Sequence, residues 1–222
     1  MTSYFVTQST FMDDQQPLDT LHDIKRMMER SSRFISLSGL SGIVAGVFAL
    51  VGAFIANGWI TSYKTQDEDK FGDANVQDLR LRLLLLAGTI LILAMASSFY
   101  FSLRRARKNA LPIWDHSSKK LLVNLLIPLI AGGFFIMGLW YHHNLELVMP
   151  ACLVFYGMAL VNASKYTLSD IRYIGLMEIV LGIINLFYND PAFSIYFWAI
   201  GFGLLHIVYG SMMWLKYEWN SK

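Results

Sequence analysis

The chain alternates between long apolar stretches and short polar connections, and this alternation is its dominant pattern. A helix needs about 20 apolar residues to cross the roughly 30 Å hydrocarbon core of a bilayer. The stretches that meet this requirement are Phe34–Ile60, Leu83–Leu103, Leu121–Trp140, Leu145–Ala163, Leu168–Tyr188 and Phe193–Leu215. The sequence therefore predicts an all-α polytopic membrane protein with six transmembrane helices.

The polar remainder divides the chain into three parts. Residues 1–33 form a polar leader, residues 34–216 carry the six spans, and residues 217–222 form a short C-terminal tail. Within the leader, residues 17–33 repeat apolar side chains at helical spacing. This spacing predicts a short amphipathic helix, which either lies on the membrane surface or stays solvated. The six spans use most of the chain, so we expect no second, soluble domain.

Basic residues are distributed unevenly around the six spans. Of the 18 Lys and Arg residues, 14 lie in the leader, in or beside every second connection, and after the sixth span. The other four are Lys64, Lys70, Arg80 and Arg82, which share the first connection with five acidic residues. The positive-inside rule then places both termini in the cytoplasm (N-in/C-in). We expect a multi-pass protein of the inner (plasma) membrane, whose basic loops contact anionic lipid headgroups and not nucleic acid.

The composition supports a membrane protein and narrows the chemistry. The chain is 55% hydrophobic and 15% charged, whereas about a quarter of the residues in a soluble domain are charged. Its single cysteine, Cys152, lies inside the fourth span and excludes an intrachain disulfide. No P-loop, dinucleotide-binding fingerprint or nucleophile elbow occurs in its structural context. We therefore expect no cofactor, and an enzyme is the less favoured class.

The odd-numbered spans resemble one another. Gly39–Gly52 reads GLSGIVAGVFALVG, Gly175–Tyr188 reads GLMEIVLGIINLFY, and Leu125–Gly138 reads LLIPLIAGGFFIMG. The first two share Gly, Leu, Ile, Val, Gly and Leu at matched positions. Either three helical hairpins are repeated about an axis along the membrane normal, or apolar helices match by chance, and both interpretations stay open. The glycine-bearing faces are also compatible with a homo-oligomer.

The Gly-rich first span and the GxxxIVxGxxxL pattern of the fifth make the chain resemble the HdeD-like acid-resistance membrane proteins, which are six-span bacterial proteins. The resemblance covers the hairpin pattern along most of the chain and rests on small and apolar residues. It implies a six-span fold and a role in the stress response, and it transfers no functional residue. The long polar leader and the basic second loop depart from the compact pattern of that family.

Glu178 and His206 are the sharpest chemical signal, because they are the only acidic residue and the only histidine deep in the predicted spans. An ionisable group at such depth is costly and marks a functional site by default. Glu178 shares one helix face with Gly175, Gly182 and Asn185. A short connection makes the fifth and sixth spans expected neighbours, so the two ionisable side chains should meet. A structural pair that fastens the two spans is the competing interpretation.

Other polar residues gather in the same half of the membrane. The candidate solute- or proton-binding residues are Glu178, His206, Tyr209, Tyr156 and Asn162. We interpret them as a cytoplasm-facing polar site at which the protein binds or conducts a small solute or a proton. The alternative is a non-catalytic membrane partner or stress-response protein, which would act through basic cytoplasmic elements in residues 17–33 and 104–119.

One group of residues has the composition of a metal site. His142, His143 and Glu146 lie in the connection between the third and fourth spans. A His and a Glu four residues apart on a helix can share a metal ion. A helix break expected near Asn144 would spoil this geometry, and no fourth ligand is evident. We therefore expect no metal and interpret these residues as part of an interfacial turn.

Overall fold

The computed structural model describes residues 38–64, 73–109, 114–188 and 191–219, which form helices joined by turns. Within these residues, six helices are long and apolar enough to cross a membrane. The all-helical, six-span prediction is confirmed to this extent. The predicted leader of residues 1–33, with its amphipathic helix, lies outside the described residues.

The helices follow the predicted spans, with shifts at their ends. The first five are α2 (Gly39–Lys64), α3 (Asp73–Lys108), α4 (His116–Tyr141), α5 (Val148–Ala163, after a 3-10 turn at Leu145–Leu147) and α6 (Ile171–Tyr188). The sixth, here called the final helix, consists of α7 (Pro191–Trp198), a π-helical segment (Ala199–Leu205), α8 (His206–Trp214) and a second π-helical segment (Leu215–Trp219). Residues 217–219, expected in the tail, thus continue the final helix.

Local backbone chemistry sets both ends of α4. The Asp115 carboxylate accepts a hydrogen bond from the Ser118 backbone N–H at 2.7 Å, and the Ser118 hydroxyl accepts one from the Asp115 N–H at 2.9 Å. This reciprocal capping box satisfies amide groups that the first turn of a helix leaves unpaired. At the other end, His143 has φ 61° and turns the chain toward α5. The helix break predicted near Asn144 is confirmed.

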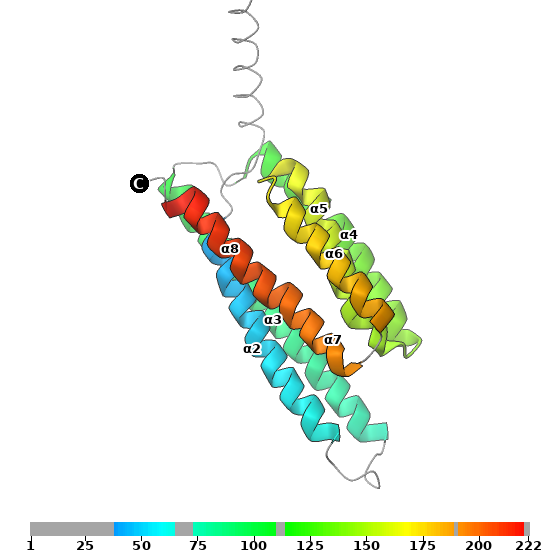
Figure 1. Cartoon of the computed structure of the whole chain (residues 1–222). Coiled ribbons are helices and arrows are strands. Elements are labelled where there is room, and N and C mark those ends of the chain that lie inside the picture. Colours follow the sequence, from blue (N-terminus) through cyan, green and yellow to red (C-terminus); the bar gives the residue numbers. More distant parts are fainter. Residues whose placement is uncertain (1–37, 65–72, 110–113, 189–190, 220–222) are drawn as a thin grey trace, which may run out of the picture.

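The six helices pack as two groups of three (Figure 1). In one group α2 lies between α3 and the final helix, and in the other α5 lies between α4 and α6. Contacts between the groups run through α7 and the π-helical segment Ala199–Leu205, which touch α5 and α6. The final helix therefore packs along α2 more extensively than along α6, although α6 precedes it in sequence.

Glycines allow the closest approaches between helix backbones. A methyl group added at Gly39 would collide with the backbone of Gly210 across the contact between α2 and α8. Gly157 on α5 and Gly175 on α6 stand in the same relation, each against the carbonyl oxygen of the other. Such contacts hold helices together where lipid removes the hydrophobic driving force. These glycine faces are thus occupied by packing within one chain.

Large apolar side chains cover the outside of the bundle. Phe54, Phe134 and Phe187 are 81%, 69% and 84% exposed. The apolar window of α3 has none of its residues buried, and that of α4 only 6%. Lipid tails solvate a surface of this kind, and every backbone amide inside a helix is satisfied there. The surface is that of a multi-pass membrane protein.

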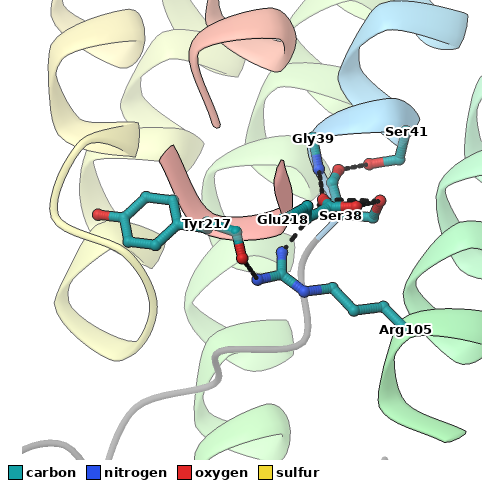
Figure 2. Close-up of polar contacts among 6 residues, drawn as sticks. All are labelled: Ser38, Gly39, Ser41, Arg105, Tyr217 and Glu218. Carbon is teal, nitrogen blue, oxygen red and sulfur yellow. Dashed lines mark hydrogen bonds and ion pairs between the residues drawn. The ribbon is translucent and has the colours of Figure 1, made fainter. Parts of the chain in front are cut away.

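A partly buried ion pair joins the C-terminal segment to the end of α3, beside the beginning of α2 (Figure 2). Glu218 Oε1 lies 3.3 Å from Arg105 Nη1 on α3. The same oxygen accepts hydrogen bonds from the Gly39 N–H at 2.6 Å and the Ser38 hydroxyl at 3.0 Å. A carboxylate at this position satisfies a free amide and complements the positive end of the α2 dipole. One side chain thus ties together α2, α3 and the final helix.

The end of the bundle that carries this ion pair is called the basic end. It also bears exposed basic side chains, which are Arg104, Arg107, Lys108, Lys119 and Lys120. A second contact lies there, where Lys216 Nζ is 2.8 Å from Asp170 Oδ2 and the Tyr217 hydroxyl donates to the same oxygen at 3.1 Å. Because Asp170 precedes α6, residues 216–218 connect the two groups of helices.

We expect Glu218→Ala to lower the free energy of unfolding by about 2 kcal/mol, because it removes a charged acceptor from partly buried donors. Asp78→Ala is the control, since Asp78 and Arg82 form an ion pair whose side chains are more than half exposed. Such a pair should contribute less than about 0.5 kcal/mol. Denaturant titration in detergent micelles measures both, and equal effects would show that the buried pair adds no stability of its own.

Candidate functional site

The structure brings Glu178, His206 and Tyr156 together where the two groups of helices meet. The Glu178 side chain is fully buried, and His206 is 12% exposed. Glu178 Oε1 lies 3.6 Å from His206 Nδ1. The two ionisable side chains that the sequence singled out are therefore neighbours, contributed by α6 and by the final helix.

Hydrogen bonds fix the orientation of the imidazole. The Tyr156 hydroxyl oxygen lies 2.7 Å from His206 Nε2, and His206 Nδ1 lies 3.0 Å from the Gly201 carbonyl oxygen. A carbonyl oxygen can only accept, so Nδ1 carries a hydrogen. In the neutral imidazole Nε2 is then an acceptor, and the Tyr156 hydroxyl donates to it. Tyr156, His206 and Glu178 thus form a continuous series of proton-carrying groups.

The π-helical segment Ala199–Leu205 places His206 at this point. A π turn inserts one residue into the helical ladder, changes which face the following side chains occupy, and occurs often at functional sites. Gly201 lies within this segment and is buried. A methyl group at Gly201 would lie 2.5 Å from Glu178 Oε2 and 2.5 Å from Leu153 Cδ2. Only glycine lets the carboxyl group approach the backbone of the final helix this closely.

The surroundings of the carboxyl group are poor in hydrogen-bond donors. Within the described part of the chain, neither oxygen of Glu178 has a hydrogen-bond partner. Leu153, which packs beside it against Gly201, is itself fully buried. Burying a carboxylate without hydrogen bonds is expensive, so the charged form depends on a neighbouring cation or the group takes up a proton. His206 is the neighbour that can supply that charge.

Aromatic rings enclose the imidazole on the final helix. The ring centroids of Phe202 and His206 are 6.2 Å apart in a stacked arrangement, and Trp198 continues the series 5.1 Å from Phe202. Tyr156 lies 5.1 Å from Phe202 and 5.4 Å from His206. Rings in this geometry attract one another and fill the space around the imidazole. They hold His206 in one orientation and separate it from lipid.

The other two predicted site residues lie apart from this cluster. The Tyr209 hydroxyl is buried and has no hydrogen-bond partner among the described residues. It is close enough to Asp170, Tyr217 and Tyr156 for electrostatic interaction. Asn162 donates instead to the Asn124 carbonyl oxygen at 2.9 Å and so joins α5 to α4. The structure gives Asn162 no hydrogen bond to Glu178 or His206 among the described residues.

Two buried polar residues escaped the sequence-based selection. Asn185 is fully buried on α6, and the Ser194 hydroxyl of α7 donates to its Oδ1 at 2.9 Å. The signal for Asn185 was present, because it falls seven residues after Glu178 on the same helix face. Ser194 carried no such signal, since only the packing of α7 against α6 brings it there. The sequence likewise provided no signal for Gly201, because its role depends on its contact with the Glu178 carboxyl group.

Metal binding finds no support in the described residues. No group of three or more His, Cys, Asp or Glu side chains in this part of the chain is close enough to hold a metal ion. His142, His143 and Glu146 are exposed in the turn between α4 and α5 and do not form such a group.

The phenol of Tyr156, the imidazole of His206 and the carboxyl group of Glu178 can each gain or lose a proton. Tyr156 is hydrogen-bonded to His206, and the Glu178 carboxyl group lies 3.6 Å from the other nitrogen of that imidazole. The arrangement can therefore hold and relay a proton. Its geometry is the basis for inferring function, because no protein family, curated protein or solved structure matches the chain.

Proposed function

We propose that the protein conducts protons across the membrane, alone or together with a small solute, by passing a proton from the Tyr156 hydroxyl to His206 Nε2 while the Nδ1 hydrogen of His206 passes to the Glu178 carboxylate. One observation carries the proposal. The fully buried Glu178 carboxyl group has no hydrogen-bond partner among the described residues, and its Oε1 lies 3.6 Å from His206 Nδ1.

The spacing of the pair favours a working site over a structural fastening. A buried ion pair offsets the cost of desolvation only when its remaining hydrogen-bonding positions are also satisfied. Those of Glu178 are not, and 3.6 Å exceeds a good charge-assisted hydrogen bond. A carboxyl group that alternates between neutral and charged forms does not need fixed partners for either form. The site therefore fits a group that changes protonation during its work.

Packing around the carboxyl group favours a proton over a larger ligand. Gly201 and Leu153 both lie against the Glu178 side chain. A proton requires no volume beyond that of the groups that carry it, whereas a solute would have to displace one of these neighbours. A transported solute would therefore bind beside this site and be coupled to it.

The proposed orientation places the basic end in the cytoplasm. The exposed basic side chains at the C-terminal end of α3 and the N-terminal end of α4 lie there, as the positive-inside rule favours. They would contact anionic lipid headgroups. The alternative role as a membrane partner rests on the same exposed side chains of residues 104–119, because residues 17–33 lie outside the described part of the chain.

The proposed repeat gains support from two helix pairs with matched glycine contacts. In the pair of α2 and the final helix, Gly39 meets Gly210 and Gly46 meets Gly203, seven residues further along. In the pair of α6 and α5, the same spacing separates two contacts, which are Gly175 with Gly157 and Gly182 with Pro150. A tyrosine precedes both Gly157 and Gly210. These correspondences support a relation between the two helix pairs, although α2 and the final helix are not consecutive in the chain and form no hairpin.

Tyr156→Phe tests the relay, since it removes only the hydroxyl group that lies 2.7 Å from His206 Nε2 and keeps the stacked ring. We expect proton flux into proteoliposomes, driven by an imposed pH gradient or membrane potential, to fall severalfold. Tyr173→Phe is the control, because its ring is 67% exposed on α6, and it should leave the flux unchanged. Equal flux in the two variants, or no wild-type flux above that of protein-free liposomes, would contradict the proposal.

A further inference from the structure

Two buried polar groups beyond Glu178 also lack a hydrogen-bond partner among the described residues. They are the Asn185 Nδ2 amide on α6 and the Tyr209 hydroxyl on α8. Asn185 makes one hydrogen bond, through Oδ1, with the Ser194 hydroxyl. Exchanging its oxygen and nitrogen atoms would still leave one end of the amide unpaired. An unsatisfied buried amide or hydroxyl is costly, and ordered water is its common partner in proteins.

The two groups lie on opposite sides of the proposed proton site along the same helix pair. Asn185 is seven residues beyond Glu178, about 10 Å along the same face of α6 and away from the basic end. Tyr209 is three residues beyond His206, about 4.5 Å toward the basic end. The unsatisfied groups thus succeed one another along the boundary between the two groups of helices, with Asn185 and Glu178 on α6 and Tyr209 on α8.

This line reaches a partly exposed carboxylate at the basic end. There, Tyr209 lies near Asp170, whose carboxylate is bonded to Lys216 and Tyr217. At the other end, Asn185 lies three residues before the last residue of α6 and Ser194 lies three residues after the first residue of α7. A relay that stopped at Glu178 and Tyr156 would lack a connection to water on either side.

We infer that Asn185 and Tyr209 bind water molecules that extend the relay from Glu178, His206 and Tyr156 to both faces of the membrane. This inference rests on the proposed function and identifies the path by which the proton enters and leaves. The Asn185 amide and the Ser194 hydroxyl orient water on the side away from the basic end. The Tyr209 hydroxyl orients it on the side of Asp170.

Cysteine labelling tests the path without any measurement of transport. The single native cysteine is removed by Cys152→Ala, and Asn185→Cys is introduced into the full chain in proteoliposomes. The probe is a small positively charged methanethiosulfonate reagent, which reacts with a thiolate in water and not with a thiol in a dry interface. Ala53→Cys is the matched buried control, because Ala53 on α2 is 6% exposed and lies in an apolar cluster with Ala56 and Ile195. Phe187→Cys, at a residue 84% exposed, reports on the lipid face of α6.

We expect Asn185→Cys to react at least about tenfold faster than both controls, since only a hydrated thiol ionises. Labelling of Asn185→Cys as slow as that of Ala53→Cys would show a dry interface and overturn the inference. Equally fast labelling of Ala53→Cys would show general loosening of the bundle and overturn it too. On the other side, Tyr209→Phe should reduce proton flux severalfold, and flux equal to that of the wild type would remove Tyr209 from the path.

The outcomes separate this inference from the proposed function. If Asn185→Cys labels slowly while proton flux still depends on Glu178, the proposed proton site is retained and the water path is rejected. If Asn185→Cys labels fast while Glu178→Gln does not change the flux, the interface is hydrated and the proposed function is rejected.

Discussion

Glu178→Gln is expected to reduce proton flux in proteoliposomes to the level of protein-free liposomes. Glutamine keeps the size of the side chain against Gly201 but cannot release or accept a proton at neutral pH. The relay would then be interrupted at its most buried member, 3.6 Å from His206 Nδ1. Flux is measured with a pH-sensitive dye enclosed in the liposomes, at matched protein density.

Glu146→Gln is the control for this result, because Glu146 is exposed in the turn between α4 and α5. Its flux should equal that of the wild type. Stability supplies a second comparison, since replacing a poorly satisfied buried charge by an apolar residue is often neutral or stabilising. Glu178→Leu should therefore unfold no earlier than the wild type. Retained flux in Glu178→Gln, or marked destabilisation by Glu178→Leu with retained flux, would favour a structural pair.

Gly175→Val is expected to cost about 3 kcal/mol or more of unfolding free energy, at the upper end of the effects of overpacking. A Cβ at Gly175 would lie 2.8 Å from the Gly157 carbonyl oxygen and 2.9 Å from the Val161 backbone nitrogen. Neither atom belongs to a flexible side-chain end, so the helices α5 and α6 would have to separate. Because Glu178 lies on the same face of α6, this separation would also disturb the site.

Gly133→Val provides the matched control for this substitution. Gly133 is in α4, and nothing lies within 4 Å of a Cβ added there. We expect its free energy of unfolding, measured by denaturant titration, to stay within about 0.5 kcal/mol of that of the wild type, as for surface substitutions in general. Similar losses in the two valine variants would mean that the contact between Gly157 and Gly175 does not hold α5 and α6 together.

Hydropathy alone located all six helices, because crossing a bilayer imposes a length of apolar sequence that loops do not have. Hydropathy placed the start of α3 at Leu83, whereas the helix begins at Asp73. The segment from Asp73 to Arg82 is polar, and hydropathy detects only the apolar part of a helix. The final helix likewise continues to Trp219, beyond the apolar stretch that ends at Leu215.

The candidate site was predictable in its ionisable members and not in its architecture. Glu178 and His206 stood out because charged groups are rare within spans. Their contact depends on the π-helical segment at Ala199–Leu205, which no pattern of apolar residues announces. Chain proximity predicted that the final helix contacts α6, which it does, but it did not predict the more extensive packing of the final helix along α2.

The ion pair at the basic end illustrates a second kind of contact hidden from the sequence. Arg105 and Glu218 are 113 residues apart, and each has an ordinary position at the polar end of an apolar span. Their pairing follows from the glycine contacts that align α2 with the final helix, which bring Glu218 to the first amide of α2. Charge patterns along a chain report which side of a membrane a residue favours, not which partner it meets.

Infrared difference spectroscopy of the protein in lipid tests the central claim most directly, because a protonated carboxyl group has its own carbonyl band. If Glu178 binds and releases a proton, lowering the pH should produce a protonated-carboxyl band that shifts in heavy water and is missing in Glu178→Gln. A spectrum in which Glu178→Gln removes no pH-dependent carboxyl band would show that Glu178 does not change protonation, and it would contradict the account.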